Sequence, residues 1–226
     1  CLVLGSGDTT CALCSVDLVS VSKEVTNRVR EAASEATGIA PESILVAATH
    51  THSGPITIQR ITGENDTVKP EVDAQYMTSV VRTLASLIKT AYANAEPCEI
   101  AFAEADGTGV GGNRRDPEGA YDPEVPVMVV RRAHDKAVCG LLTAYCMHPT
   151  VLHEDNTLYS ADFCGKTREY LKQALPALDT YLYFTGPEGN QSPRRFVTDT
   201  TFAEAERLGY LLGERIMDAV DGLDEE

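Results

Sequence analysis

The chain has 226 residues, and its 34 acidic and 19 basic side chains give it a formal net charge of −15 at pH 7. With 43% hydrophobic and 23% charged residues it can bury a substantial core, which excludes a disordered or fibrous protein. The negative charge repels phosphate groups, so we expect no nucleic-acid partner. The longest aliphatic stretch, around residues 125–130, is interrupted by Pro126 and is far shorter than the roughly 20 residues that span a bilayer, so we expect no transmembrane segment.

The first third of the chain alternates strands with a helix. Turn residues separate the short apolar runs at residues 2–4 and 11–18, which predicts a hairpin. Apolar residues at helical spacing over residues 21–36, followed by Gly38, predict an amphipathic helix with a C-terminal glycine. The apolar run at residues 44–49 predicts a strand that is buried on both faces.

Further along, periodicity and turn signals predict three more helices and several more strands. The helices are expected at residues 71–95, 162–175 and 200–220, and the strands at residues 127–131, 137–146, 181–185 and from Ile100 onward. This order favours an α/β fold, or a mixed α+β fold, with a mixed sheet flanked by helices and active-site residues on strand-end loops. We expect residues 1–226 to form a single domain.

The seven cysteines are an odd number scattered along the chain. This argues against a disulfide framework and for mostly reduced, buried thiols, and it favours a reducing compartment such as the cytoplasm. Cys11 and Cys14 lie inside an apparent strand, so we interpret them as core residues and not as a redox pair.

Two histidines come directly after the apolar run at residues 44–49. His50 and His52 are one residue apart, and in extended backbone alternate side chains face the same way, about 6.6 Å apart along the strand. His148 follows another apolar strand, so it too is expected at a strand end. Because zinc accepts imidazole nitrogens, two strand ends that carry histidines predict a metal site. The alternative is that these histidines only form hydrogen bonds with local backbone groups.

Other polar residues in loops are candidates for a site. Ser192 lies in the loop of residues 186–193 and is either a nucleophile, a polar clamp or part of a plain turn. Arg114 lies in a glycine-rich loop, where it either holds an anionic group or is a solvated surface arginine. The glycines of residues 107–112 have dinucleotide-binding spacing but are not followed by a helix, so we reject that function. His134, in a hairpin turn, is expected to be exposed and inert.

Several short motifs, taken in order, resemble the N-terminal catalytic domain of the neutral/alkaline non-lysosomal ceramidase family. They are residues 47–55 (Ala-Ala-Thr-His-Thr-His-Ser-Gly-Pro), 113–114, 121–122, 148–150, 160–163 with Gly165, and 189–193. The similarity covers nearly the whole chain, which we expect to be part of that domain and truncated at both ends.

The resemblance implies a zinc-dependent amide hydrolase. In that family the matching histidines hold zinc, which implies His50 and His148 as metal ligands and Zn²⁺ as the cofactor. Water activated by the metal would cleave the N-acyl bond of a ceramide-like lipid. The resemblance also places His52, Arg114 and Ser192 around the substrate amide, with His52 moving a proton and Arg114 stabilising the oxyanion or holding a substrate hydroxyl.

The sequence also departs from the family pattern. Asn190 and Gln191 replace an aspartate and a valine, and Arg115 and Cys164 replace a serine and a proline, so we expect a different substrate pocket. The family's remaining zinc ligands, a glutamate and a tyrosine, lie C-terminal to anything that matches here. We therefore expect the isolated chain to bind zinc weakly, unless a residue such as Asp162 substitutes. The alternatives are a related metal amidase with a smaller polar substrate and a catalytically degenerate binding domain.

Overall fold

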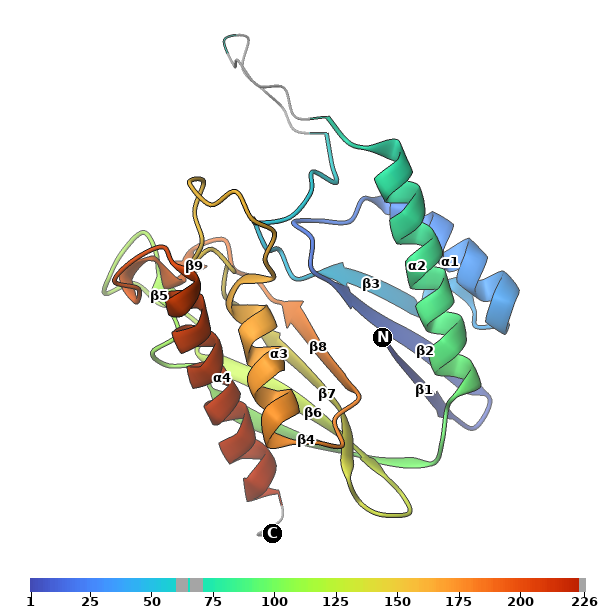
Figure 1. The fold of residues 1–226 in the computed structure, drawn as a ribbon. Coiled ribbons are helices and arrows are strands. Elements are labelled where there is room, and N and C mark those ends of the chain that lie inside the picture. Colours follow the sequence, from blue (N-terminus) through green and yellow to red (C-terminus); the bar gives the residue numbers. More distant parts are fainter. Residues whose placement is uncertain (60–64, 66–70, 224–226) are drawn as a thin grey trace.

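The computed structural model describes residues 1–59, 65 and 71–223. Its two larger sheets are each covered on one face by a pair of helices (Figure 1). Each sheet has its own apolar core. The sequence favoured an α/β or a mixed α+β fold with helices flanking a mixed sheet, and the mixed α+β form with flanking helices is confirmed. None of the helices in the described residues has the length and apolarity needed to cross a membrane.

The first sheet has the order β1-β2-β3. Its elements are β1 (Leu2–Ser6), β2 (Thr9–Val16) and β3 (Ile44–Ala48), with α1 (Lys23–Thr37) between β2 and β3 and the 3-10 turn η1 (Pro41–Ser43) before β3. β1 and β2 form the predicted hairpin, and β3 lies parallel to β2. The predicted helix is also confirmed, since the Ser22 hydroxyl caps α1 and Gly38 ends it at φ 78°.

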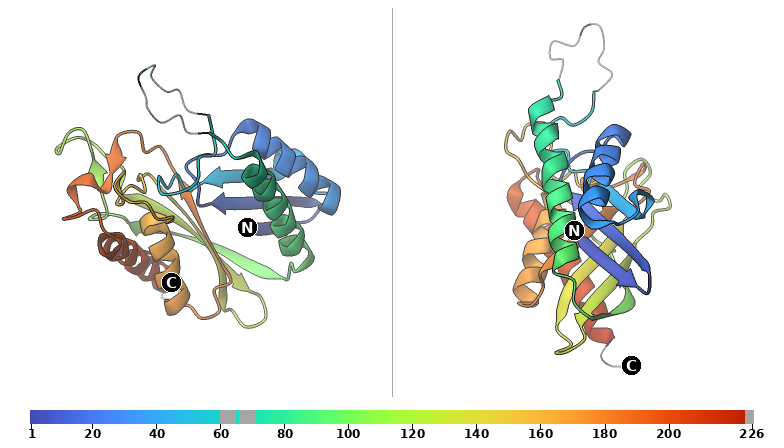
Figure 2. Two further views of the ribbon diagram at one scale, coloured as in Figure 1. Left: turned by 45° about the horizontal axis from the view of Figure 1, so that its top comes forward. Right: turned by 90° about the vertical axis from the view of Figure 1, so that its right-hand side faces the viewer.

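Helices α1 and α2 (Ala74–Ala93) cover one face of this sheet (Figure 2). Ile44 and Val46 of β3 are buried under them, but Leu45, which points to the opposite face, is 46% exposed. The prediction of a strand buried on both faces was therefore wrong. β3 is an edge strand, and the helices cover only one side of it.

The second sheet has the order β4-β6-β7-β8. Its strands are β4 (Cys98–Asp106), β6 (Glu124–Arg132), β7 (Val138–Tyr145) and β8 (Thr180–Thr185). The first three are antiparallel, and β8 runs parallel to β7. Helices α3 (Asp162–Ala174) and α4 (Phe202–Gly222) pack on this sheet (Figure 1). Residues such as Phe163, Leu171, Leu208 and Leu212 fill the core beneath them.

Two short strands that the sequence did not predict hold the loops together. β5 (Gly112–Asn113) pairs with β9 (Gln191–Ser192), which is followed by the 3-10 turn η2 (Pro193–Arg195). The glycine-rich loop is thereby joined to the loop that follows β8. The ends of β3, β7 and β8 point toward this region (Figure 1).

The seven cysteines are all free, but only Cys14 and Cys164 are buried. The expectation of mostly buried thiols was therefore wrong, because the other five lie at partly or fully exposed positions. Cys14 does pack in the first core, and burial raises the pKa of its thiol to about 11.

Candidate metal centre

Three histidines from two distant parts of the sequence meet at the strand ends. The ring centroid of His50 lies 4.9 Å from that of His52 and 5.0 Å from that of His148. The ring centroids of His52 and His148 are 5.9 Å apart. One ligand nitrogen from each ring lies within 4.8 Å of the others. The predicted approach of these histidines is therefore confirmed. It makes them a group that can hold a metal ion.

The approach of His50 to His52 arises from a turn and not from strand alternation. β3 ends at Ala48, and His50 has a left-handed backbone with φ 68°. Its N–H donates to the carbonyl oxygen of Leu18, and the buried Thr51 hydroxyl donates to that of Ser160. These two hydrogen bonds fix the turn. The prediction of an extended His-Thr-His segment was therefore wrong in its geometry, although the rings do come together.

The Nδ1 atoms of two of these histidines are bound to backbone carbonyl groups. His50 Nδ1 lies 2.6 Å from the oxygen of Val19, and His148 Nδ1 lies 2.9 Å and 3.0 Å from those of Glu188 and Gln191. A carbonyl oxygen only accepts, so Nδ1 carries the proton in both rings and Nε2 carries a lone pair. The alternative, that these histidines form hydrogen bonds with backbone groups, thus holds for the Nδ1 atoms of His50 and His148. Such a bond at Nδ1 also orients the ring and leaves Nε2 available to bind a metal.

A carboxylate that the sequence analysis did not single out faces both lone pairs. Glu188 Oε1 lies 3.4 Å from His50 Nε2 and 3.6 Å from His148 Nε2. Its side chain is only 11% exposed, and its Oε2 is buried with no hydrogen-bond partner among the described residues. Glu188 follows a strand end, as the histidines do. The signal in the sequence that could have predicted Glu188 as a site residue is an acidic side chain in the polar loop that follows an apolar strand.

Burial shifts the pKa values of this cluster in opposite directions. Desolvation raises the pKa of Glu188 to about 8, and the positive charge of Arg114 opposes that rise. Desolvation lowers the pKa of His148, with smaller contributions from Arg114 and His50, while its hydrogen bonds to the Gln191 and Glu188 backbone oppose the shift. Near neutral pH, the cluster therefore favours a neutral imidazole at His148, which is the form that binds metals.

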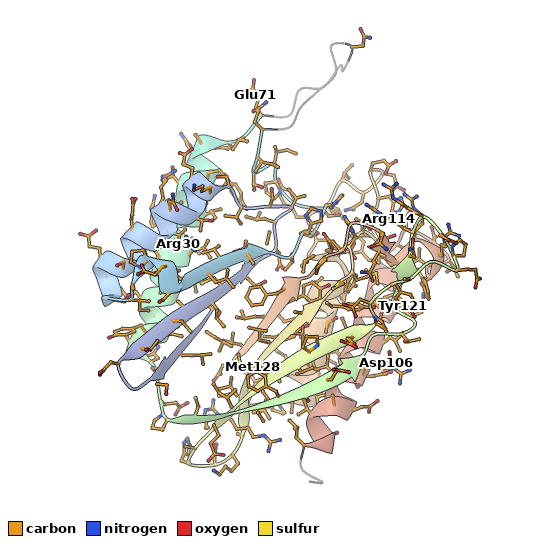
Figure 3. All side chains as sticks on the ribbon, turned by 180° about the vertical axis from the view of Figure 1, so that it is seen from behind. Arg30, Glu71, Asp106, Arg114, Tyr121 and Met128 are labelled. Atoms are coloured by element: carbon orange, nitrogen blue, oxygen red, sulfur yellow. The ribbon has the colours of Figure 1, made fainter. Side chains whose placement is uncertain are left out.

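Arg114 and Ser192 belong to the joined loops beside the histidines. The Arg114 guanidinium donates from Nε and Nη2 to the carbonyl oxygen of Gly189, at 3.1 and 2.8 Å, and its backbone N–H donates to Asn190. Figure 3 shows Arg114 among these loops. The Ser192 hydroxyl, which is buried, accepts a hydrogen bond from the N–H of Arg194. Arg114 therefore holds the loop that carries Glu188, and Ser192 caps η2.

Asp162 is not part of this cluster. Its two carboxylate oxygens accept hydrogen bonds from the backbone N–H groups of Leu152, at 3.0 Å, and Phe163, at 2.7 Å. It begins α3 with a left-handed φ of 56°. The idea that Asp162 substitutes as a metal ligand was therefore wrong, because the backbone already uses both of its oxygens.

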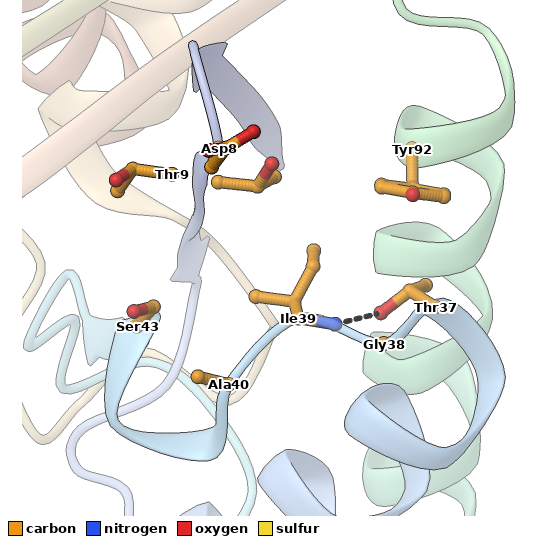
Figure 4. A pocket seen from close by; sticks show the side chains of 9 residues that line it. Asp8, Thr9, Thr37, Gly38, Ile39, Ala40, Ser43 and Tyr92 are labelled. Carbon is orange, nitrogen blue, oxygen red and sulfur yellow. Dashed lines mark hydrogen bonds between the residues drawn. The ribbon is translucent and has the colours of Figure 1, made fainter.

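A cavity of about 440 Å³ lies at the opposite end of the first sheet, beside the β1–β2 turn (Figure 4). Its lining residues are Asp8, Thr9, Thr10, Thr37, Gly38, Ile39, Ala40, Ser43 and Tyr92. Asp8 and Tyr92 are its only titratable side chains. Its other polar groups are hydroxyls, so the cavity lacks the group of metal-ligating side chains that distinguishes the histidine cluster.

The fold and the cluster together define an α+β protein with a candidate metal centre at its strand ends. The family model for the neutral/alkaline non-lysosomal ceramidase N-terminal region matches residues 2–181. The chain therefore belongs to the neutral/alkaline non-lysosomal ceramidase family. No curated protein sequence is similar enough to count as a match.

Two solved structures share the fold. One, described as ceramidase complexed with C2, has a TM-score of 0.81 at 18% identity and covers 96% of this chain and 36% of its own. The other, neutral ceramidase from Pseudomonas aeruginosa, has a TM-score of 0.78 at 18% identity and covers 96% of this chain and 37% of its own. The chain thus spans little more than a third of the length of either structure.

Proposed function

We propose that this chain carries the metal-binding part of a zinc-dependent amide hydrolase that cleaves the N-acyl bond of ceramide-like lipids. The observation that carries the proposal is the meeting of His50, His52 and His148 at the strand ends of a chain in the ceramidase family. A ceramidase of similar fold was solved in complex with C2, which supports an N-acyl lipid as the substrate class.

The orientation of the rings supports a division of roles. His50 and His148 would hold the metal through their Nε2 atoms, since their Nδ1 atoms are bound to carbonyl groups. Zinc held there would supply Lewis-acid chemistry and an activated water. His52 is exposed and adjoins both rings, so it would take up and return a proton during hydrolysis.

Arg114 and Ser192 would act on the substrate amide. Two guanidinium nitrogens of Arg114 donate to Gly189, and its remaining N–H groups would stabilise negative charge on the amide oxygen. The Ser192 hydroxyl accepts from Arg194, so its own proton would be donated to a polar group of the substrate.

Exposed apolar side chains beside the histidines favour a lipid over a small polar amide. Leu158 is 64% and Tyr159 79% exposed. Their loop is tied to the His-Thr-His segment, because the Ser160 N–H donates to the Ser53 carbonyl group and the Asn156 side chain donates to the Ser53 hydroxyl. Apolar surface at this position would contact an acyl chain.

The test measures zinc content and the hydrolysis of N-acyl sphingosine and of a short N-acyl amino alcohol by the protein that contains this chain. His148→Ala is expected to lose bound zinc and to lower kcat by more than about 1,000-fold. His134→Ala is the matched control, because His134 lies 67% exposed on the β6–β7 turn. Unchanged zinc content and hydrolysis in His148→Ala would defeat the proposal. Preference for the short amide would favour a polar substrate, and zinc binding without hydrolysis would favour a binding domain.

A further inference from the structure

We propose that the Glu188 carboxylate is a direct ligand of the metal, alongside His50 and His148. The proposal rests on the proposed function in one respect, namely that a divalent cation binds at these two histidines. It adds a ligand that this chain supplies from the loop after β8, which also carries Ser192.

The two distances from Glu188 Oε1 to the histidine nitrogens are close to those between neighbouring ligand atoms in a coordination shell. Glu188 Oε1 lies 3.4 Å from His50 Nε2 and 3.6 Å from His148 Nε2. Around a tetrahedral zinc ion with bonds of about 2.0–2.1 Å, neighbouring ligand atoms are about 3.3 Å apart. Two imidazoles and one carboxylate, with the fourth position open to water, is also a known catalytic ligand set for zinc.

The arrangement of acceptor atoms in the cluster favours a positive charge between them. The Nδ1 atoms carry the ring protons, so the Nε2 lone pairs of His50 and His148 both face Glu188 Oε1. This oxygen is a third acceptor when the carboxylate is ionised. The second oxygen of Glu188 is buried without a hydrogen-bond partner among the described residues. Burying polar atoms in this way is costly, and a cation between the three acceptors would offset that cost.

The loop holds Glu188 in place from both sides. The Gln191 backbone N–H donates to the Glu188 carbonyl oxygen at 2.8 Å, and the Gln191 side chain donates to that of Pro187 at 3.1 Å. Arg114 binds the carbonyl group of Gly189, the next residue. A carboxylate that is fixed before the metal arrives binds it with less loss of conformational entropy.

The test compares metal binding by the protein that contains this chain with binding by Glu188→Gln, which keeps the shape of the side chain but removes its charge. Zinc affinity is measured by chelator competition, and the coordination shell by the visible spectrum of the Co²⁺-substituted protein. Loss of a residue that only orients a ligand costs 10–100-fold in affinity. We therefore expect Glu188→Gln to lower zinc affinity by more than about 100-fold and to change the Co²⁺ spectrum, with the thermal midpoint in chelator unchanged.

Glu154→Gln is the matched control, because it makes the same change of charge at an exposed carboxylate, 3.9 Å from His153. It should leave both metal readouts unchanged. Wild-type affinity and an unaltered Co²⁺ spectrum in Glu188→Gln would overturn this inference. The proposed function would survive that result if His148→Ala still lost zinc. Absence of metal binding in the wild-type protein would overturn both.

Discussion

The hydroxyl group of Thr185, at the end of β8, donates a hydrogen bond of 2.6 Å to the carbonyl oxygen of Thr49, the residue before His50. β3 and β8 are edge strands of different sheets, so this bond joins the sheets beside the candidate metal centre. A second bond, from the Ser15 hydroxyl to the Tyr183 carbonyl oxygen at 2.5 Å, joins them further along β8. These two hydrogen bonds form the seam between the sheets. The position of the His50 segment relative to the His148 segment depends on it.

Thr185→Val tests the seam while keeping the shape of the side chain. It leaves the Thr49 carbonyl group without this donor, so we expect the free energy of unfolding to fall by about 1–2 kcal/mol. Zinc affinity should fall several-fold, because His50 follows Thr49. Urea unfolding and zinc titration measure the two effects. Thr90→Val, which removes a comparable bond on the exposed face of α2, should change stability by less than about 0.5 kcal/mol. Equal effects of the two variants would contradict this role.

Asp162→Ala should destabilise the protein through the start of α3. It removes an acceptor for two backbone N–H groups, those of Leu152 and Phe163, at a position that is only 2% exposed. We expect a loss of about 2–4 kcal/mol, because hydrogen bonds to charged groups contribute more than neutral ones. Denaturant unfolding checks this against Asp155→Ala, which alters an exposed residue. A loss under 1 kcal/mol would show that the two N–H groups find other acceptors.

Gly111→Ala should disturb the residue before His148. A Cβ atom at Gly111 would lie 2.2 Å from Met147 Sδ and 3.0 Å from the Ser192 carbonyl oxygen, and Met147 is fully buried. We expect a loss of about 1–3 kcal/mol from overpacking, together with weaker zinc binding. Calorimetry and zinc titration measure both. Gly222→Ala, where a Cβ meets nothing within 4 Å in α4, should be neutral or stabilising. Wild-type stability of Gly111→Ala would refute the close packing.

Glu204→Gln should remove part of the dependence of stability on acid pH. Hydrogen bonds from Arg207, and then from the Thr198 N–H, lower the pKa of Glu204 from 4.5 to about 2. Because the folded state has the lower pKa, this stabilisation is present above about pH 4.5 and is lost as the pH falls toward 2. The difference in urea midpoint between wild type and Glu204→Gln should therefore shrink between pH 5 and 2. The lowered pKa of Glu204 would not be the cause if the difference in urea midpoint stayed constant over that range. The same holds if Glu214→Gln, on the same helix, gave the same pH dependence.

The sequence by itself determined the local elements and the kind of chemistry. The Ser22 and Gly38 ends of α1, the β1–β2 hairpin and the histidines at strand ends follow from capping, turn and periodicity signals that act between near neighbours. The similarity of short motifs to a known family also lies in the sequence alone, and the family match agrees with it.

Only the tertiary structure decided how these pieces meet. The left-handed turn at His50, the facing of Glu188 toward His50 and His148, and the binding of Arg114 to Gly189 each depend on chain segments brought together by strand pairing. Local sequence patterns cannot predict such contacts. The contacts depend on which strand edges lie side by side and on which polar atoms become buried away from water. The candidate metal ligands could therefore be predicted as histidines at strand ends, whereas Glu188 faces them only because the loop after β8 lies beside the ends of β3 and β7.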